Sequence, residues 1–375
     1  MIRFESVSKR YPDGTVAVDE LDVVAASGQI TVFVGPSGCG KTTSLRMINR
    51  MIEPTAGRIW LDDRDTASFS AAELRRGIGY VIQHAGLFPH RTVVDNVATV
   101  PLLLGKSKRE ARQQAMELLD RVGLAAKFAK RYPAQLSGGQ QQRVGVARAL
   151  AADPPVMLMD EPFSAVDPVV RHDLQEEFLR LQGELGKTIV FVTHDIDEAV
   201  KLGDQVAVMR VGGKLAQLAS PAELLTSPAD AFVAGFVGRD RGYRALAFEP
   251  AGALPTHDEP VVTLGSELAA APVGWVLVVD DNRQPQGWID TATQRSEQGA
   301  RVGPELIHRG GTLATHSGSL RAALDAALSS PSGRGVVVGD DGRLIGTMTT
   351  AEVIELINQH AAANREAHSA AEAGT

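Results

Sequence analysis

The sequence predicts an α/β protein of two domains. Short β-branched apolar runs begin at Gln29, Pro154, Lys187 and Asp204 and alternate with helical stretches, which is the pattern of a buried parallel sheet covered by helices on both faces. A glycine-rich loop follows the first run directly, and the charge balance changes near residue 240. At 375 residues the chain is too long for a single ordinary core.

The change in charge gives the predicted domain boundary. From Asp240 onward there are 17 Asp and Glu against 10 Arg and no Lys, which accounts for the whole formal charge of −7. Residues 1–239 therefore carry no net charge, and we expect them to form one domain and residues 240–360 another. Neither part has the positive balance typical of nucleic-acid binding, so no nucleic-acid partner is expected.

The compartment follows from cysteine usage and hydropathy. Cys39 is the only cysteine, so no intrachain disulfide can form and a reducing cytosol is expected. The first residues carry charges where a signal peptide needs an apolar segment. No apolar run reaches the roughly 18 residues of a membrane span. If the protein works at a membrane, we expect partner subunits to hold it there.

The loop "GPSGCGKTT" matches the pattern G-x-x-x-x-G-K-[ST] at the end of an apolar run and before a helical stretch. Glycines allow backbone N–H groups to turn toward phosphate oxygens, and the following helix directs its positive end at them. This context favours a nucleoside triphosphate site over a fortuitous glycine-rich turn. The loop residues expected to bind the nucleotide are Gly35, Pro36, Ser37, Gly38, Cys39, Gly40, Lys41, which reaches the phosphates, Thr42, whose hydroxyl holds Mg²⁺, and Thr43.

A second glycine pair precedes another helical stretch. The motif "LSGGQQQR" and the strand "PPVMLMDEP" follow the first loop in an order that resembles the ATP-binding-cassette (ABC) ATPases. In that family the signature closes on the ATP held by the opposite subunit. The resemblance assigns this contact to Ser137, Gly138, Gly139 and Gln140.

The same resemblance implies a role for six further residues. A carboxylate just beyond a metal ligand suits in-line phosphoryl transfer, which depends on positioning and charge stabilisation. The implied roles are Mg²⁺ organisation by Asp160, activation of the attacking water by Glu161, γ-phosphate contact by His194, sensing of Mg²⁺ and water by Gln83, adenine stacking by Tyr11, and nucleotide binding by Asp167 in the D-loop.

The resemblance covers residues 1–239 and includes a helical subdomain at about 84–150, where "KSKREARQQAMELLDRVGL" is apolar at helical spacing. It implies a head-to-tail dimer of two copies of this chain with ATP and Mg²⁺ at the seam. ABC ATPases power transporters or act on DNA and ribosomes. Because this chain has one cassette, one cysteine and no long heptad run, a transport function is favoured.

The segment "QHAGLFPHRTVVDNVATVPLLLG" resembles the coupling region of importers for glycine betaine, choline, carnitine or proline. The expected partners are transmembrane permease subunits and, indirectly, an extracytoplasmic solute-binding protein. The expected location is the cytoplasmic face of the cell membrane, as a peripheral subunit. An ATPase of an amino-acid or sugar importer remains the alternative.

The last part of the chain contains an imperfect repeat. "WVLVVDDNRQPQGWID" at residues 275–290 and "GVVVGDDGRLIGTMTTAE" at residues 335–352 each predict a strand, an acidic turn and a second strand. This order resembles a tandem pair of cystathionine-β-synthase (CBS) domains, with copies at about 243–300 and 301–360 and a flexible tail at 361–375. The alternative is the small β-barrel that follows the cassette in many sugar importers.

Many CBS pairs bind adenosine nucleotides with G-x-x-[TS]-x-x-D. The second copy offers Gly346, Thr349 and Glu352, whereas the first copy lacks both polar positions after Gly287. At most one intact site is therefore expected, in the second copy. A purely structural module, a nucleotide sensor and a sensor of ionic strength all remain open, although the absence of lysine disfavours docking of a whole basic face on anionic lipid.

Overall fold

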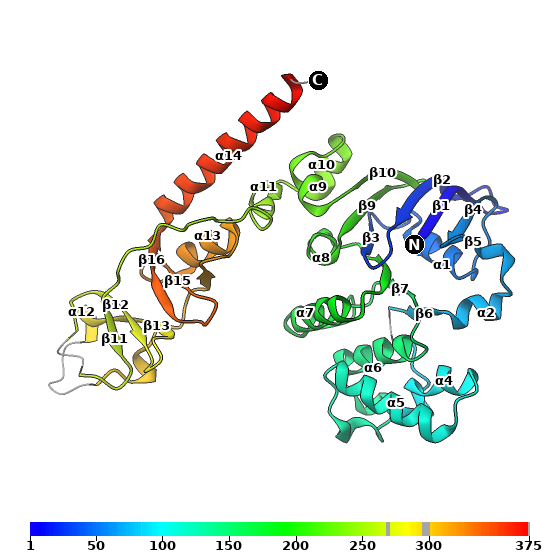
Figure 1. The fold of residues 1–375 in the computed structure, drawn as a ribbon, viewed down its shortest axis with the longest axis horizontal. Coiled ribbons are helices and arrows are strands. Elements are labelled where there is room, and N and C mark those ends of the chain that lie inside the picture. The colour runs from blue at the N-terminus through cyan, green and yellow to red at the C-terminus, as the bar shows by residue number, and fades with distance from the viewer. Residues whose placement is uncertain (84, 268–270, 295–300, 374–375) are drawn as a thin grey trace. The chain divides into compact units, whose positions relative to one another are not determined.

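The computed structural model describes residues 1–83, 85–267, 271–294 and 301–373. The chain divides into two compact units, Met1–Arg239 and Asp240–Thr375 (Figure 1). The division falls where the charge balance of the sequence changes. Each unit contains hydrophobic clusters of its own and is described separately.

The first unit contains a six-stranded sheet in the order β10-β9-β3-β8-β7-β6. All neighbours are parallel except β10 and β9. Every residue of β3, β7 and β8 is buried, as the continuous apolar runs predict. The strands are β3 (Ile30–Val34), β6 (Ile78–Val81), β7 (Val156–Asp160), β8 (Thr188–Val192), β9 (Gln205–Arg210) and β10 (Lys214–Ala219).

A second, antiparallel sheet has the order β2-β1-β4-β5. Phe4 and Leu21 of this sheet share one buried cluster with Phe33 and Leu158 of the parallel sheet. The sequence analysis does not predict this sheet, because its strands alternate irregularly between buried and exposed residues. The strands are β1 (Ile2–Arg10), β2 (Val16–Ala25), β4 (Ala56–Leu61) and β5 (Arg64–Asp65).

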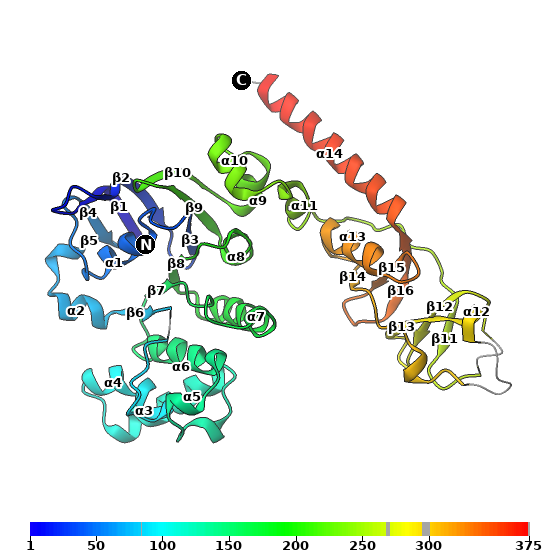
Figure 2. The ribbon, with the colours of Figure 1, turned by 180° about the vertical axis from the view of Figure 1, so that it is seen from behind.

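The helices of the first unit fall into two groups. One group lies in the segment predicted as a helical subdomain and surrounds a cluster that includes Val97, Leu119 and Val144; Figures 1 and 2 show it gathered at one end of the unit. It comprises α3 (Val93–Val97), α4 (Thr99–Leu103), α5 (Lys108–Arg121) and α6 (Gly138–Leu150), with 3₁₀ turns at Ala126–Phe128 and Pro133–Gln135. The others are α1 (Lys41–Ile48), α2 (Ala71–Arg76), α7 (Pro168–Leu185), α8 (Ile196–Leu202), α9 (Pro221–Thr226) and α10 (Ala231–Val237).

The second unit contains two matching three-stranded sheets, β11-β12-β13 and β14-β15-β16. Val278 faces Gly287 in one sheet and Val337 faces Gly346 in the other, and both hairpins shift register one pair later. Because the described strands form two separate sheets accompanied by helices, the β-barrel alternative is excluded. The elements are α11 (Arg241–Ala245), β11 (Val261–Thr263), β12 (Trp275–Val279), β13 (Pro285–Asp290), α12 (Thr291–Gln294), β14 (Leu313–Thr315), α13 (Leu320–Ser329), β15 (Arg334–Val338), β16 (Leu344–Thr349) and α14 (Thr350–Ala373).

The segment that leads into each copy pairs with a strand of the other copy. His257, ahead of β11, exchanges two backbone hydrogen bonds with Thr347 in β16 (2.8 and 3.0 Å). His308, ahead of β14, does the same with Trp288 in β13 (2.7 and 3.0 Å). A shared cluster that includes Leu277 and Val336 joins the two sheets. The repeat is therefore one packed body rather than two adjacent ones.

The flexible tail predicted at residues 361–375 is helical as far as Ala373, because α14 continues through it. The segment is rich in alanine, the strongest helix former, which the prediction underweighted. In the first copy, the only stretch that predicts a helix ahead of the hairpin is the short "SELAAA". It falls partly on residues 268–270, which lie outside the described residues.

Candidate functional site

The parallel sheet brings the predicted site residues to one edge. The loop at Gly35 follows β3, Asp160 ends β7, His194 comes two residues after β8, and Gln83 comes two residues after β6. Since these four strands are parallel neighbours, their carboxyl ends lie side by side, where open α/β sheets bind ligands.

The glycine-rich loop is shaped by close packing. Gly40 has φ +94°, and a Cβ on it would lie 2.1 Å from the carbonyl oxygen of Ala17 in β2. Gly40 also stands at the start of α1, where no side chain caps the helix, so its first N–H groups are available to an anion. The Nζ of Lys41 lies within the loop and donates to the carbonyl oxygens of Gly35 (2.7 Å) and Pro36 (3.0 Å).

The first turn of α1 contacts the end of β7. The Thr42 hydroxyl donates to Oδ1 of Asp160 at 2.9 Å. Burial raises the pKa of Asp160 above its usual value, while the Thr42 hydrogen bond opposes that rise. A hydroxyl and a poorly solvated carboxylate side by side are oxygen ligands of the kind that Mg²⁺ prefers, so these residues fit a divalent cation.

Arg46 is a site residue that the sequence analysis missed. Its guanidinium lies 3.8 Å from Oδ2 of Asp160. The available signal was its spacing, because a residue four positions after Thr42 lies on the same face of the helix.

Glu161 and His194 form a second contact at this edge. Oε2 of Glu161 lies 3.0 Å from Nδ1 of His194. Glu161 has φ +46°, a left-handed conformation that costs a non-glycine residue about 1–2 kcal/mol. Its N–H donates to the carbonyl of Val192 at 2.9 Å, and Ser164 Oγ donates to its carbonyl oxygen at 2.9 Å. The backbone is thus held in a strained conformation that places a carboxylate one residue beyond Asp160, as functional sites often do.

The signature residues lie in the helical group, at the start of α6. Ser137 caps the helix by accepting from the N–H of Gln140, whose side chain in turn accepts from the N–H of Ser137. Ser137 and Gly138 are exposed. None of the hydrogen bonds among the described residues joins this motif to the loop at Gly35. The start of α6 is therefore free to present Ser137 and Gly138 to a ligand from another source.

The remaining predicted residues border the site. Tyr11 follows β1, and the Nζ of Lys9 lies 5.3 Å from its ring centroid. Gln83 is exposed beyond β6. Asp167 is exposed, and its carboxylate accepts from the N–H of Val169 as the cap of α7. None of the hydrogen bonds among the described residues joins these three side chains to one another or to the Glu161 and His194 pair.

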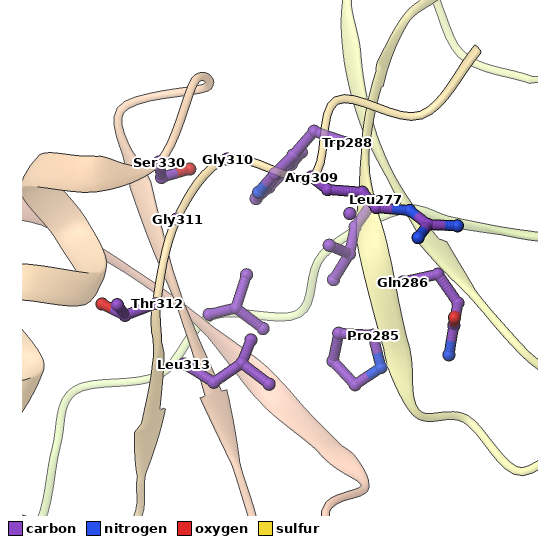
Figure 3. Close-up of a pocket in the computed structure, with 12 residues that line it drawn as sticks. Leu277, Pro285, Gln286, Trp288, Arg309, Gly310, Gly311, Thr312, Leu313 and Ser330 are labelled. Carbon is purple, nitrogen blue, oxygen red and sulfur yellow. The ribbon is translucent and has the colours of Figure 1, made fainter. Parts of the chain in front are cut away.

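The second unit contains a cavity of about 170 Å³ that is lined by residues of both copies of the repeat (Figure 3). Trp288 and Pro285 line it from β13, and Arg309 and Leu313 from the segment that leads into β14. The sequence pattern does not predict this cavity.

In the second copy the motif carboxylate is already engaged by the chain itself. Glu352 accepts from the N–H and the hydroxyl of Thr349, each at 2.8 Å, and pairs with Nε2 of His257. The N–H of Thr349, followed by the His257 and Thr349 side chains, lowers the pKa of Glu352 to about 2. A Cβ on Gly346 would lie 2.6 Å from the carbonyl oxygen of His257, so the lead segment packs directly on the motif.

In the first unit, the phosphate loop lies beside a hydroxyl and carboxylate pair and a second carboxylate at a strand end, and a separate helical group carries an exposed signature motif. These features together define an ABC-type ATPase domain. The sequence pattern of the family described as "ABC transporter" matches residues 18–164. Choline transport ATP-binding protein OpuBA of Bacillus subtilis is 42% identical over 95% of this chain and 96% of its own length. Carnitine transport ATP-binding protein OpuCA of Listeria monocytogenes is 42% identical over 95% of this chain and 92% of its own. The chain belongs to this family of ABC transporter ATP-binding proteins and is an ATPase.

Solved structures agree with the fold. The dimeric, post-hydrolysis structure of the ATP-binding cassette MJ0796 bound to ADP and Pi is 34% identical and covers 59% of this chain and 99% of its own, with a TM-score of 0.54. CbiO1 of Clostridium perfringens is 29% identical and covers 60% of this chain and 90% of its own, with a TM-score of 0.56. The predicted ABC ATPase fold is confirmed.

Proposed function

We propose that this chain hydrolyses ATP to power the uptake of a quaternary amine or related compatible solute, of the kind represented by glycine betaine, choline, carnitine and proline, through separate membrane subunits. The observation that carries this proposal is the reach of the similarity. The relatives named for choline and carnitine transport match 95% of the chain, so they share the second unit as well as the cassette. Osmoprotectant import ATP-binding protein OsmV of Salmonella typhimurium matches 93% at 42% identity.

The site supports a mechanism in which the chain positions the reactants. The N–H groups of the Gly35–Thr43 loop and Lys41 hold the phosphates, and Tyr11 stacks on adenine. Thr42, Asp160 and Gln83 would hold Mg²⁺, which supplies charge neutralisation when bound. Glu161 accepts a proton from the attacking water, while His194, 3.0 Å from Glu161, contacts the γ-phosphate.

The working unit in this proposal is a two-fold dimer. Ser137 and Gly138 are exposed at the start of α6 and would close on ATP bound to the partner's loop, with Asp167 of the D-loop beside them. A two-fold arrangement needs only one kind of chain, because each copy offers both surfaces. The dimeric form of MJ0796 supports this arrangement.

Transport requires partners that this chain does not supply. No helix in the described part of the chain is both long and apolar enough to cross a bilayer. We infer that permease subunits recruit the chain to the cytoplasmic face of the membrane and that a solute-binding protein delivers the solute to them. The second unit, a CBS-like pair, would regulate the ATPase in response to ionic conditions or a nucleotide.

Solute uptake tests the proposal. In a strain that lacks this chain, uptake of labelled glycine betaine, choline, carnitine and proline is measured at high osmolarity, with labelled maltose and histidine as controls. We expect loss of uptake of at least one of the four and its recovery with the intact chain. Unchanged uptake of all four together with lost uptake of a control would assign the chain to another importer.

A further inference from the structure

The last turn of the signature helix holds the turn that follows Gln83. Nη1 of Arg148 donates to the carbonyl oxygen of Gly86 at 2.6 Å, and Nη2 donates to that of Ala85 at 2.8 Å. Arg148 lies in the last turn of the same helix, α6, that begins with the signature residue Gly138. None of the roles proposed above involves Arg148.

The turn that Arg148 holds is unusual. Ala85 and Gly86 are consecutive residues in the left-handed region, with φ +54° and +53°. The N–H of Ala85 donates to the carbonyl of Ile82 at 3.0 Å, and a Cβ on Gly86 would lie 2.4 Å from Cδ1 of Ile82. A non-glycine residue in this conformation costs about 1–2 kcal/mol, so the turn needs support from its surroundings.

Helix α6 supports the turn at two positions, Gly145 and Arg148. Gly145 lies almost one helical turn before Arg148, and a Cβ on it would lie 3.4 Å from the Cβ of Ala85. This is the distance of ordinary van der Waals contact, so Ala85, which is 2% exposed, packs directly against the helix at this point. Arg148 then fixes the carbonyl groups of the turn from the side.

The guanidinium group of Arg148 is suited to holding two neighbouring carbonyl groups in place. Burial lowers its pKa from the usual value, which means that the charged form has lost part of its hydration. The two hydrogen bonds to carbonyl oxygens offset that loss. A guanidinium presents two donors at a fixed spacing, whereas the ammonium of lysine cannot hold two neighbouring carbonyl groups in the same planar way.

We propose that Arg148 is a positioning residue that makes Gln83 follow the signature helix. This inference rests on the proposed ATP-sandwich dimer. Gly139 and Arg148 are separated by about 14 Å along one continuous helix, at 1.5 Å per residue. When the partner's ATP engages the start of α6, the helix moves as a body, and Arg148 carries the turn after Gln83 with it. The position of Gln83 relative to Mg²⁺ and water in one ATP site therefore depends on whether ATP occupies the other site of the dimer.

The test uses the full-length chain and the substitution Arg148→Lys, alone and with Gln83→Ala. We expect Arg148→Lys to lower kcat for ATP hydrolysis about tenfold and to leave the Kd for ATP within twofold, because the loop at Gly35 is untouched. In the Gln83→Ala background the same substitution should change kcat less than twofold, because Arg148 acts through Gln83. An Arg148→Lys effect that persists in full without the Gln83 side chain would overturn the proposal.

Hydrogen exchange gives a readout that does not depend on activity. In the chain without nucleotide, Arg148→Lys should speed amide exchange in a peptide that spans Ala85 and Gly86 at least fivefold. Unchanged exchange would show that Arg148 does not hold the turn and would overturn the proposal even if the chain hydrolysed no ATP. Absent hydrolysis by the wild type together with faster exchange would instead count against the proposed function alone.

Arg75 offers a matched control. It donates to the backbone carbonyl oxygens of Asn49 and Arg50, as Arg148 does to those of Ala85 and Gly86, but it lies in α2, outside the proposed site. Arg75→Lys should leave both kcat and the exchange of the Ala85 peptide within twofold of the wild type. An equal loss of kcat in Arg75→Lys would mean that the Arg148 effect is general destabilisation.

Discussion

Two glycines of the phosphate loop, Gly38 and Gly40, allow the contribution of close packing to ATP affinity to be measured. Both have positive φ, +78° at Gly38 and +94° at Gly40. A Cβ on Gly38 meets nothing within 4 Å, whereas one on Gly40 would lie 2.1 Å from the carbonyl oxygen of Ala17 and 3.2 Å from Cγ2 of Val18. Gly38→Ala therefore adds only backbone strain, and Gly40→Ala adds strain and a collision with β2.

The expected magnitudes follow from these distances. Strain alone is worth about 1–2 kcal/mol, or roughly 5- to 30-fold in ATP affinity if the loop relaxes out of its binding conformation. Real Cβ contacts are essentially never shorter than 3.0 Å, so in Gly40→Ala the start of α1 must move about 0.9 Å away from β2. A misplacement of about 1 Å can cost roughly 100-fold, so we expect Gly40→Ala to bind ATP about 100-fold more weakly than Gly38→Ala.

Isothermal titration calorimetry of the full-length chain measures both affinities, and Glu161→Gln is included in each variant to prevent hydrolysis during the titration. Thermal unfolding is followed in parallel to show that both variants fold. If the two folded variants bound ATP with affinities within threefold of each other, the argument from close packing against Ala17 would be refuted.

Three further predictions concern carboxylates. Glu161→Gln should lower kcat by about 10²–10⁴-fold and yet give a stable dimer with ATP in sedimentation velocity, because only the group that accepts the proton of water is lost; a kcat near that of the wild type would exclude this role. Asp160→Asn should raise the Mg²⁺ concentration for half-maximal hydrolysis at least about tenfold, measured at saturating ATP, and an unchanged requirement would remove Asp160 from the metal site. For Glu352, a folded-state pKa of about 2 lies below the usual 4.5, so the contacts of the ionised carboxylate with Thr349 and His257 stabilise the second unit above pH 4.5, and this contribution is lost as the pH falls toward 2. The difference in unfolding free energy between wild type and Glu352→Gln, followed by Trp275 and Trp288 fluorescence, should shrink from pH 6 to pH 3 by about 1 kcal/mol, after allowance for solvent screening of a partly exposed group; a difference independent of pH would contradict the stabilising role of these contacts.

The sequence predicted those parts of the site that depend on strand order. Asp160 and His194 each come at the end of a predicted apolar run, and parallel neighbours must end at the same edge of a sheet. The positions of the side chains relative to one another at this edge could not be predicted from the sequence. The left-handed backbone of Glu161 and the approach of Arg46 to Asp160 depend on tertiary contacts that no local pattern encodes.

The second unit shows the same limit more sharply. The motif at Gly346 is the better match to a ligand-binding pattern, yet Glu352 is engaged by His257, which lies 95 residues earlier. A motif comparison considers only the residues of the motif itself. It cannot detect that a segment distant in the sequence packs on the motif and contacts its carboxylate. The cavity beside Trp288 could not be predicted for the same reason, since seven of the twelve residues that line it, including Arg309 and Leu313, come from the other copy.

The exchange of lead segments also constrains the order in which the second unit can form. His257 is synthesised 90 residues before its partner Thr347, so its two backbone hydrogen bonds cannot exist until the second copy is nearly complete. Pairings of such large sequence separation slow folding, because the loop must close before the contact forms. The second unit must therefore fold after, rather than during, the passage of most of its sequence through the ribosome, and a chain that stops between the copies leaves the edge at His257 without its native strand.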